Sequence, residues 1–222
     1  MKELLNKIHH ADCLSFMKQL PDKCVDLVLT DPPYGIDFGN FNRTNKDSSG
    51  KRYKADKYKN GDWDKEFSID AYLAEIERVS HNYIIWGGNY FPALWLKPIK
   101  GFIFWYKKNP VSNFSDGELA VTNFNKPAQC FEFAYYGNIE GSTSASKKHH
   151  PTQKPLQLFK WCLQYAKLET GIVLDCFSGS GTTALACHDL GLDFICIEKD
   201  ADYWKASCER LTQHQKQLRL AV

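Results

Sequence analysis

Seven short apolar runs alternate with segments of helical periodicity along the 222-residue chain, and this alternation limits the folds open to it. We expect strands at residues 7–11, 26–30, 83–86, 102–106, 131–136, 172–175 and 194–197. Between two of them, Ile69, Leu73 and Ile76 fall on one helical face. Strands that alternate with amphipathic helices are typical of a mostly parallel sheet with helices on both faces, so we expect an α/β fold.

Further helices follow from the same periodicity near the end of the chain. Leu156, Phe159 and Leu163 share one face, and we expect helices at 182–190 and 201–218. With 43% apolar residues and no internal repeat, residues 1–222 suit a single domain. Two segments interrupt the pattern: a long basic loop at 39–62, which we expect to be mobile, and a short polar connection at 137–153.

Bulk composition excludes several classes of protein. A net charge of +2 does not by itself indicate a polyanionic partner. The eight cysteines form no C-x-x-C pair, which favours reduced, buried thiols over a disulfide frame or a metal site. Without a signal-peptide pattern or an apolar run of eighteen residues, the chain is expected to be cytoplasmic and to have no membrane partner.

The stretch DPPY, residues 31–34, comes directly after the expected strand at 26–30. Neither proline has an amide hydrogen and both fix φ, so the motif cannot continue a central strand. It must hold one rigid extended or turn conformation, and we infer that this conformation fixes the side chains of Asp31 and Tyr34 in a functional site. Alone, Asp31 could be a turn-forming acid and Tyr34 a core aromatic residue.

A second chemical signal is the stretch GIVLDCFSGSGTTALAC, residues 171–187, in which a strand leads through a small-residue turn to a helix. Gly179 and Gly181 allow the backbone to pass close to a ligand. Glu198 follows Asp175 by 23 residues, which is the sequence spacing at which such folds place the acid that binds ribose hydroxyls. The turn lacks the third glycine of the dinucleotide fingerprint and the Lys of a phosphate loop, which argues against hydride transfer and NTP hydrolysis. A tight turn without a ligand is the alternative.

Taken together, these motifs resemble those of the S-adenosylmethionine-dependent amino-methyltransferases of DNA. DPPY precedes FSGSGTT (177–183), which is the order of the beta group, and HPTQKP (150–155) stands before the glycine loop as in that group. WKASCERL (204–211) closes the resemblance, which runs from about His9 to Arg210. It implies a circularly permuted Rossmann-like methyltransferase fold with S-adenosylmethionine as cofactor.

The chain departs from the group's pattern at two places. Asp175-Cys176-Phe177 replaces D-P-F, a change that we expect to be tolerated because the side chain there supports the loop. Only about fifteen residues stand where the group has its target-recognition region, before HPTQKP. This short region argues against independent recognition of a long site.

The resemblance assigns the catalytic role to Asp31, Pro32, Pro33 and Tyr34. An exocyclic amine is a poor nucleophile, so acceptors placed at its two N–H bonds favour the transition state. The carboxylate of Asp31 and the carbonyl of Pro32 are those acceptors in the family, and Tyr34 stacks on a base that has been flipped out of the duplex. An acid in the first position favours adenine N6 over cytosine N4.

For the cofactor, the resemblance implies that Glu198 holds the ribose and that Phe177 packs on the adenosine. The expected contacts at the glycine loop and nearby are Asp175, Ser178, Gly179, Gly181 and Thr182. Asp12 resembles the acid that binds the adenine amine, but it could instead cap a short helix. Lys154 could neutralise the methionine carboxylate, or it could be a solvated loop lysine.

For the substrate, the basic loop offers seven cations with interleaved aromatic residues, among them Arg43, Lys51 and Arg52. A solvated charge run is the alternative. Trp105 and Lys107 are expected beside the flipped base, although an aromatic residue here is about as typical of a core. Gly87 and Gly88 end a strand near the same cleft, where a bulge is the alternative.

The leading hypothesis is therefore a DNA adenine methyltransferase without a metal, which acts by base flipping in restriction-modification or host modification. The alternatives are an N4-cytosine methyltransferase, an enzyme with RNA or a protein amide as acceptor, and a non-catalytic nucleic-acid-binding subunit. The motif D-P-P-Y rather than N-P-P-Y argues against a protein acceptor. A homodimer and a cognate restriction endonuclease are the further partners that the resemblance suggests.

Overall fold

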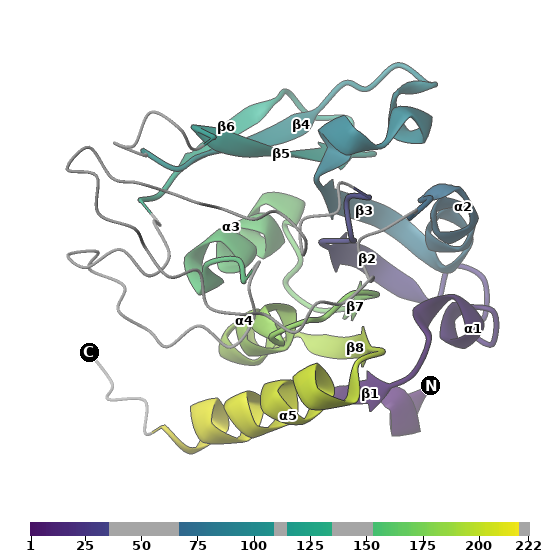
Figure 1. Cartoon of the computed structure of the whole chain (residues 1–222), viewed down its shortest axis with the longest axis vertical. Coiled ribbons are helices and arrows are strands. Elements are labelled where there is room, and N and C mark those ends of the chain that lie inside the picture. Colours follow the sequence, from purple (N-terminus) through teal and green to yellow (C-terminus); the bar gives the residue numbers. More distant parts are fainter. Residues whose placement is uncertain (36–66, 109–114, 135–152, 218–222) are drawn as a thin grey trace, which may run out of the picture.

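The structure is a computed structural model that describes residues 1–35, 67–108, 115–134 and 153–217. These residues form one eight-stranded sheet, which runs from top to bottom in Figure 1. Its strands are β1 (Lys7–His10), β2 (Val25–Thr30), β3 (Ser80–Trp86), β4 (Phe102–Tyr106), β5 (Gly117–Thr122), β6 (Gln129–Glu132), β7 (Ile172–Asp175) and β8 (Asp193–Glu198). Their order is β1-β8-β7-β2-β3-β5-β4-β6.

Five neighbouring strands, β1, β8, β7, β2 and β3, run parallel to one another. β5 is antiparallel to β3 and to β4, and β6 pairs with β4 in parallel. The expected α/β fold with a mostly parallel sheet is therefore confirmed. Residues 135 and 136 of the strand expected at 131–136 lie outside the described residues.

One strand, β5, was not expected from the sequence. Its residues GELAVT begin with Gly117 and Glu118, and only the last three are buried. Such a run is too short to show a period, and the strand forms because it pairs along its length between β3 and β4. The prediction of seven strands is therefore wrong, because β5 is an eighth strand in the described part of the chain.

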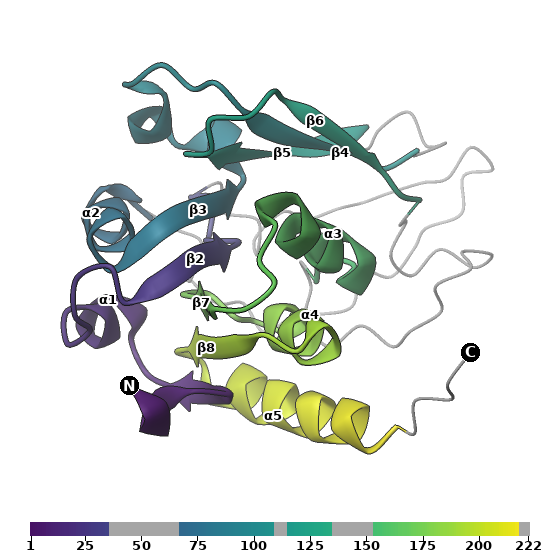
Figure 2. The ribbon, with the colours of Figure 1, turned by 180° about the vertical axis from the view of Figure 1, so that it is seen from behind.

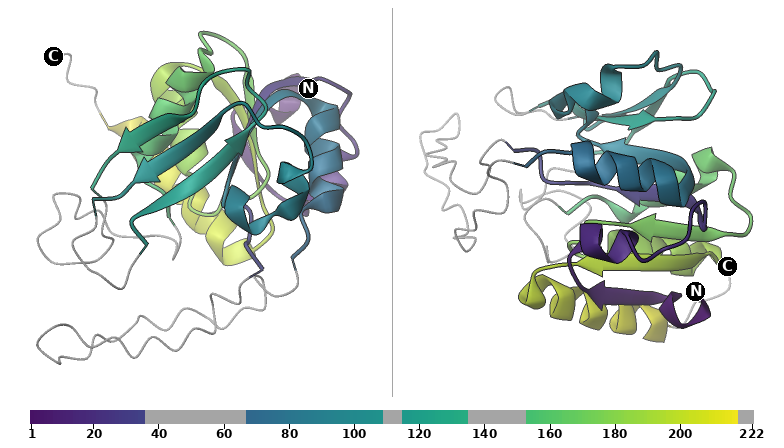
Figure 3. Two further views of the ribbon diagram at one scale, coloured as in Figure 1. Left: turned by 90° about the horizontal axis from the view of Figure 1, so that it is seen from above. Right: turned by 90° about the vertical axis from the view of Figure 1, so that its right-hand side faces the viewer.

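Helices cover both faces of the sheet. α1 (Cys13–Met17) and α2 (Asp70–Val79) lie on one face, toward the viewer in the right panel of Figure 3. The other face carries α3 (Leu156–Ala166), α4 (Thr182–Leu190) and α5 (Ala201–Lys216), which stand together in Figure 2. Short 3₁₀ helices η1 (Lys2–Leu4), η4 (Gly88–Tyr90) and η5 (Pro92–Trp95) complete the described elements. α1 is the short helix that was the alternative interpretation of Asp12, and α5 ends two residues before its expected boundary.

The core divides into two layers, as the alternation along β2 requires. Leu27 and Leu29 pack with residues of α3 and α4, whereas Val28 packs with residues of α1 and α2. All three side chains are fully buried, and burial stabilises the fold by roughly 1.5–3 kcal/mol for each one. The same burial fixes the direction of β2 and therefore the place where Asp31 emerges from the sheet.

Five of the eight cysteines are buried, as expected, whereas Cys24 and Cys208 are half-buried and Cys130 is exposed. Within the described ranges, no helix is both long enough and apolar enough to cross a membrane.

Candidate active site

The carboxyl ends of the parallel strands bring the sequence motifs to one edge of the sheet. Asp31 follows β2, Asp175 ends β7 and Glu198 ends β8. β7 lies between β2 and β8, with Leu27 opposite Val173 and Asp175 opposite Cys196. Parallel α/β sheets bind ligands at this edge, so the two motifs share one site although about 140 residues separate them.

The carboxylate of Asp31 is held by two partners. The Tyr34 hydroxyl donates to Oδ1 at 2.6 Å, and the Lys154 ammonium donates to Oδ2 at 2.5 Å. The side chain of Asp31 is 14% exposed, and Pro32 behind it is buried. Because the consecutive prolines restrict φ, the turn presents this carboxylate in one orientation.

Lys154 is the centre of a buried ionic network. Its side chain is 6% exposed, and its ammonium also forms an ion pair with Oε2 of Glu118 at 2.9 Å. Oε1 of Glu118 pairs with Lys107 at 2.5 Å. The alternative of a solvated loop lysine is wrong, because the side chain of Lys154 is buried and its charge is directed at Asp31. A contact between Lys154 and the methionine carboxylate of the cofactor stays a prediction.

Burial and charge oppose each other in this network. Burial raises the pKa of Asp31 and the carboxylate of Glu118 raises it further, whereas the Lys154 ammonium opposes the rise. Burial also acts against ionisation of Glu118, but Lys154 and Lys107 outweigh it and lower its pKa to about 2. For Lys154, burial alone lowers the pKa, yet the two carboxylates raise it above its ordinary value. The network therefore joins two lysine side chains to two carboxyl groups.

The ring of Tyr34 is enclosed by the turn after β3. Tyr90 stacks on it, with the ring centroids 4.7 Å apart and the planes inclined by 17°. Gly87 has φ +70°, and a Cβ added there would lie 2.1 Å from Cε1 of Tyr34. Only a residue without a side chain leaves room for this ring. The first glycine of the GG pair is thus a requirement of the DPPY turn.

The glycine loop is fixed mainly by protein contacts. The amide of Ser178 donates to the carbonyl of Ile197, and that of Gly179 donates to Oε2 of Glu198 at 2.8 Å. Gly179 and Gly181 both have positive φ, as expected for the turn. A Cβ at Gly181 would meet Ser207 and Ile8, so this glycine faces α5 and β1.

The side chains of two residues expected at the cofactor have protein partners. Thr182 is buried, and its hydroxyl contacts Ser180, the carbonyl of Lys154 and Arg210. Asp175 accepts hydrogen bonds from the hydroxyls of Thr30 and Thr183 and from the amide of Phe177. Burial raises the pKa of Asp175 to about 6. These contacts join β2, β7 and α4, so both residues support the loop.

The remaining residues of this loop fit S-adenosylmethionine. Phe177 forms an aromatic cluster with Phe67 and Tyr72, with ring centroids 5.5 and 5.3 Å away. Glu198 accepts from two backbone amides and keeps lone pairs for ribose hydroxyls. The hydroxyl of Ser178 is buried without a hydrogen-bond partner in the described part of the chain. An apolar wall beside unsatisfied polar atoms suits an adenosine with a polar tail.

Asp12 caps a helix, which was the alternative to its ligand role. Its Oδ1 accepts from the amide of Ser15 at 3.0 Å at the start of α1. Mainly through this bond, the pKa of Asp12 is lowered. Its Oδ2 lies 3.4 Å from Lys199, so one oxygen still faces the strand edge that carries Glu198.

The expected substrate contacts are placed as follows. Trp105 is 2% exposed and its indole donates to the carbonyl of Phe133, so it belongs to the core rather than to a base-binding surface. Lys107 is engaged by Glu118 and reaches Asp31 only through the ionic network. Arg43, Lys51, Arg52 and the basic loop lie outside the described residues, as do residues 137–152 of the polar connection.

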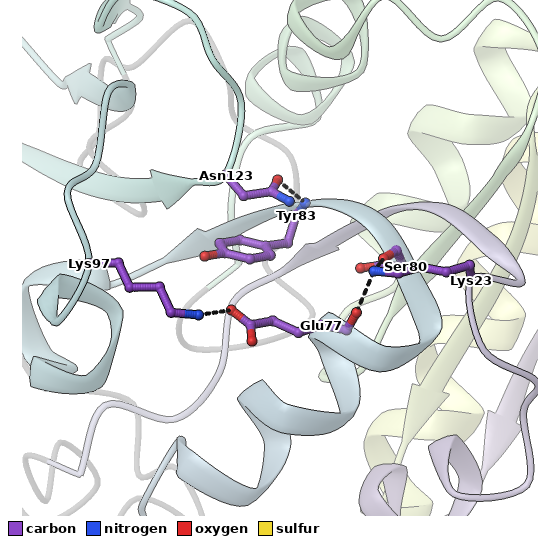
Figure 4. A pocket seen from close by; sticks show the side chains of 6 residues that line it. All are labelled: Lys23, Glu77, Ser80, Tyr83, Lys97 and Asn123. Atoms are coloured by element: carbon purple, nitrogen blue, oxygen red, sulfur yellow. Dashed lines mark hydrogen bonds and ion pairs between the residues drawn. The ribbon is translucent and has the colours of Figure 1, made fainter.

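A polar pocket of about 330 Å³ opens at the opposite, amino-terminal ends of β2 and β3 (Figure 4). The ammonium of Lys23 donates to the carbonyls of Glu77 and Ser80, and Lys97 pairs with the Glu77 carboxylate. Protein groups therefore already engage its charged side chains, and it lies at the end of these strands opposite to Asp31. Over the described ranges, no group of three or more His, Cys, Asp or Glu residues could hold a metal ion.

This fold and site define a methyltransferase that takes its methyl group from S-adenosylmethionine. A family model described as DNA methylase, for the N6/N4 methyltransferases, matches residues 82–209, more than half of the chain. The chain belongs to this family of N6-adenine and N4-cytosine DNA methyltransferases, and its cofactor is S-adenosylmethionine.

Similar proteins extend this match over nearly the whole chain. Type II methyltransferase M2.DpnII of Streptococcus pneumoniae is 26% identical over 91% of this chain and 88% of its own length. Type II methyltransferase M.HinfI of Haemophilus influenzae is 27% identical over 96% of this chain and 70% of its own. The crystal structure of the M1.HpyAVI complex with S-adenosylmethionine superposes with a TM-score of 0.59 at 26% identity, over 92% of this chain and 98% of that one.

Proposed function

We propose that this chain transfers a methyl group from S-adenosylmethionine to the N6 amine of adenine in DNA. The observation that carries the proposal is Asp31, a carboxylate fixed at the end of β2 next to the glycine loop on β7. A carboxylate is a stronger acceptor than a serine hydroxyl for an amine that becomes tetrahedral and cationic in the transition state. The family's tendency to pair an acid at this position with adenine supports the choice of base.

The chemistry can be divided among the chain's own residues. When bound, S-adenosylmethionine supplies an electrophilic sulfonium methyl group. Asp31 accepts a hydrogen bond from the target amine and orients its lone pair, and the prolines keep that acceptor fixed. Tyr34 presents an aromatic face to the extrahelical base. Because this base has left the duplex, its amine is no longer engaged in Watson–Crick pairing. Glu198 and Phe177 hold the ribose and adenine of the cofactor.

Relatives named Type II methyltransferases support a role in a restriction-modification system. In that role the enzyme would have a cognate endonuclease as functional partner, and the basic segment at 39–62 would contact DNA phosphates.

The experiment is to incubate the protein with S-adenosylmethionine and mixed-sequence DNA, digest the DNA and quantify methylated nucleosides by mass spectrometry. N6-methyladenine that is absent with Asp31→Ala supports the proposal. N4-methylcytosine would keep the mechanism and change the base. Neither product, with the cofactor bound and methyl groups found on RNA instead, would reject DNA as the acceptor.

A further inference from the structure

We propose that Lys154, held in place by Glu118, is a positioning residue that fixes the orientation and the charge of the Asp31 carboxylate. This inference rests on the proposed function, because it concerns the same acid. It adds two residues to the catalytic machinery, one of which, Glu118, belongs to no motif of the sequence.

Three charged side chains meet next to the DPPY turn. Lys154 precedes α3, Glu118 lies on β5 and Asp31 follows β2, so three separate elements bring their charges to one point. The ammonium contacts Oδ2 of Asp31 at 2.5 Å and Oε2 of Glu118 at 2.9 Å. A lysine side chain with two anionic partners is restrained in position, whereas a single partner would allow it to rotate.

The ammonium of Lys154 is buried. A lysine whose side chain is 6% exposed is rare unless its charge is compensated, because an unpaired buried ammonium is strongly destabilising. Two ammonium groups, of Lys154 and Lys107, face two carboxylates, of Glu118 and Asp31. Hydrophobic residues of similar volume would fill this space at a lower desolvation cost, so the network has a role other than stability.

The network leaves the Asp31 carboxylate able to accept a further hydrogen bond. Each carboxylate oxygen can accept two hydrogen bonds, and Tyr34 and Lys154 use one on each oxygen. A target amine can therefore bind to one of the two remaining lone pairs without displacing Lys154. A flipped base would also exclude water from Asp31, which favours the neutral acid, and the nearby cation opposes that protonation.

Charged and titratable groups face Asp31 from every element of the site. They are Lys154 before α3, Glu118 on β5, Tyr34 in the same turn and Asp175 on β7, with Lys107 beyond Glu118. Lys154 and Glu118 act on Asp31 with opposite sign, and the proposal therefore makes predictions of opposite sign for the two residues.

The test is the titration of the Asp31 carboxyl carbon, followed by carbon-13 NMR in the DNA-free protein and assigned with Asp31→Asn. Lys154→Met should raise the pKa of Asp31 by about one unit or more, and Glu118→Gln should lower it. Lys154→Arg keeps the cation and should stay near the wild type. Lys160→Met is the matched control, because it removes an ion pair with Asp189 on α4, outside this site.

The methylation step, measured in single turnover, should follow the same pattern. The acid limb of its pH profile should move to higher pH in Lys154→Met and to lower pH in Glu118→Gln, while the affinity for S-adenosylmethionine stays within about threefold. If Lys154→Met does not fold, the shift in Glu118→Gln decides the question.

Several results would overturn the inference. Shifts of the same sign in both variants, or none in either, would mean that the network is only structural. A tenfold weaker binding of the cofactor in Lys154→Met with an unchanged Asp31 titration would make Lys154 a ligand of the methionine carboxylate. If the opposite shifts appear but the wild type methylates no DNA, the positioning role stands and the proposed function fails.

Discussion

Replacement of Gly87 by alanine tests the geometry of the DPPY turn. A Cβ at this position would lie 2.1, 2.6 and 2.7 Å from Cε1, Cδ1 and Cζ of Tyr34. Unstrained carbon contacts are about 3.5–4.0 Å, so the Tyr34 ring has to move by about 1.5 Å. That movement breaks the 2.6 Å hydrogen bond from its hydroxyl to Asp31. Since a misplacement of about 1 Å costs on the order of 100-fold in rate, we expect at least this loss in the methylation step.

Backbone strain contributes separately and can be measured with a matched variant. Gly87 has φ +70° and Gly191, which ends α4, has φ +71°, but an added Cβ at Gly191 has no heavy atom within 4 Å in the described part of the chain. Each alanine should lower the free energy of unfolding by roughly 1–2 kcal/mol because of the left-handed backbone. Only Gly87→Ala should slow the methylation step.

The assays are single-turnover methyl transfer at saturating cofactor and urea unfolding of both variants. Equal methylation rates for Gly87→Ala and Gly191→Ala would refute the argument, because the Tyr34 ring would then be free to move without consequence. A stability loss in Gly87→Ala without a loss of rate would lead to the same conclusion.

Three further perturbations test other parts of the site. Burial raises the pKa of Asp175 from 3.8 to about 6, so the folded state binds this proton more tightly than the unfolded chain. The stabilisation from protonated Asp175 is fully present below about pH 4 and is lost as the pH rises through about 6. Asn cannot ionise, so the free energy of unfolding of Asp175→Asn, measured by chemical denaturation, should rise by up to about 3 kcal/mol relative to that of the wild type over this range. A difference in unfolding free energy that does not change with pH would contradict this. Asp12→Ala removes the cap of α1 and should lower the free energy of unfolding by about 1 kcal/mol, whereas Asp12→Ser keeps the cap. If Asp12 is also a cofactor ligand, both variants should bind S-adenosylmethionine more weakly in calorimetry; otherwise neither should. Glu198→Gln should weaken cofactor binding by about tenfold, and unchanged affinity would remove Glu198 from the ribose site.

The sequence predicted the parts of the site that are local in the chain. DPPY after a strand and a glycine turn between a strand and a helix depend on backbone restrictions within a few residues, and both were found as expected. Their adjacency followed from the parallel sheet, because its strands share one carboxyl edge.

Contacts between distant segments were not predictable in the same way. Glu118 meets Lys154 across a separation of 36 residues, through a strand too short to show a period. Nothing in HPTQKP distinguishes a lysine aimed at Asp31 from a solvated one. Trp105 was misplaced for a similar reason, since its burial depends on pairing of β4 with β5 and β6.

The most direct test of the account is single-turnover transfer of a labelled methyl group from S-adenosylmethionine to DNA, with wild type and Asp31→Asn compared at equal cofactor occupancy. We predict that the wild type labels adenine and that the variant binds the cofactor with similar affinity but transfers the label at least about 100-fold more slowly. Equal transfer rates would contradict the assignment of Asp31 as the acceptor that activates the amine.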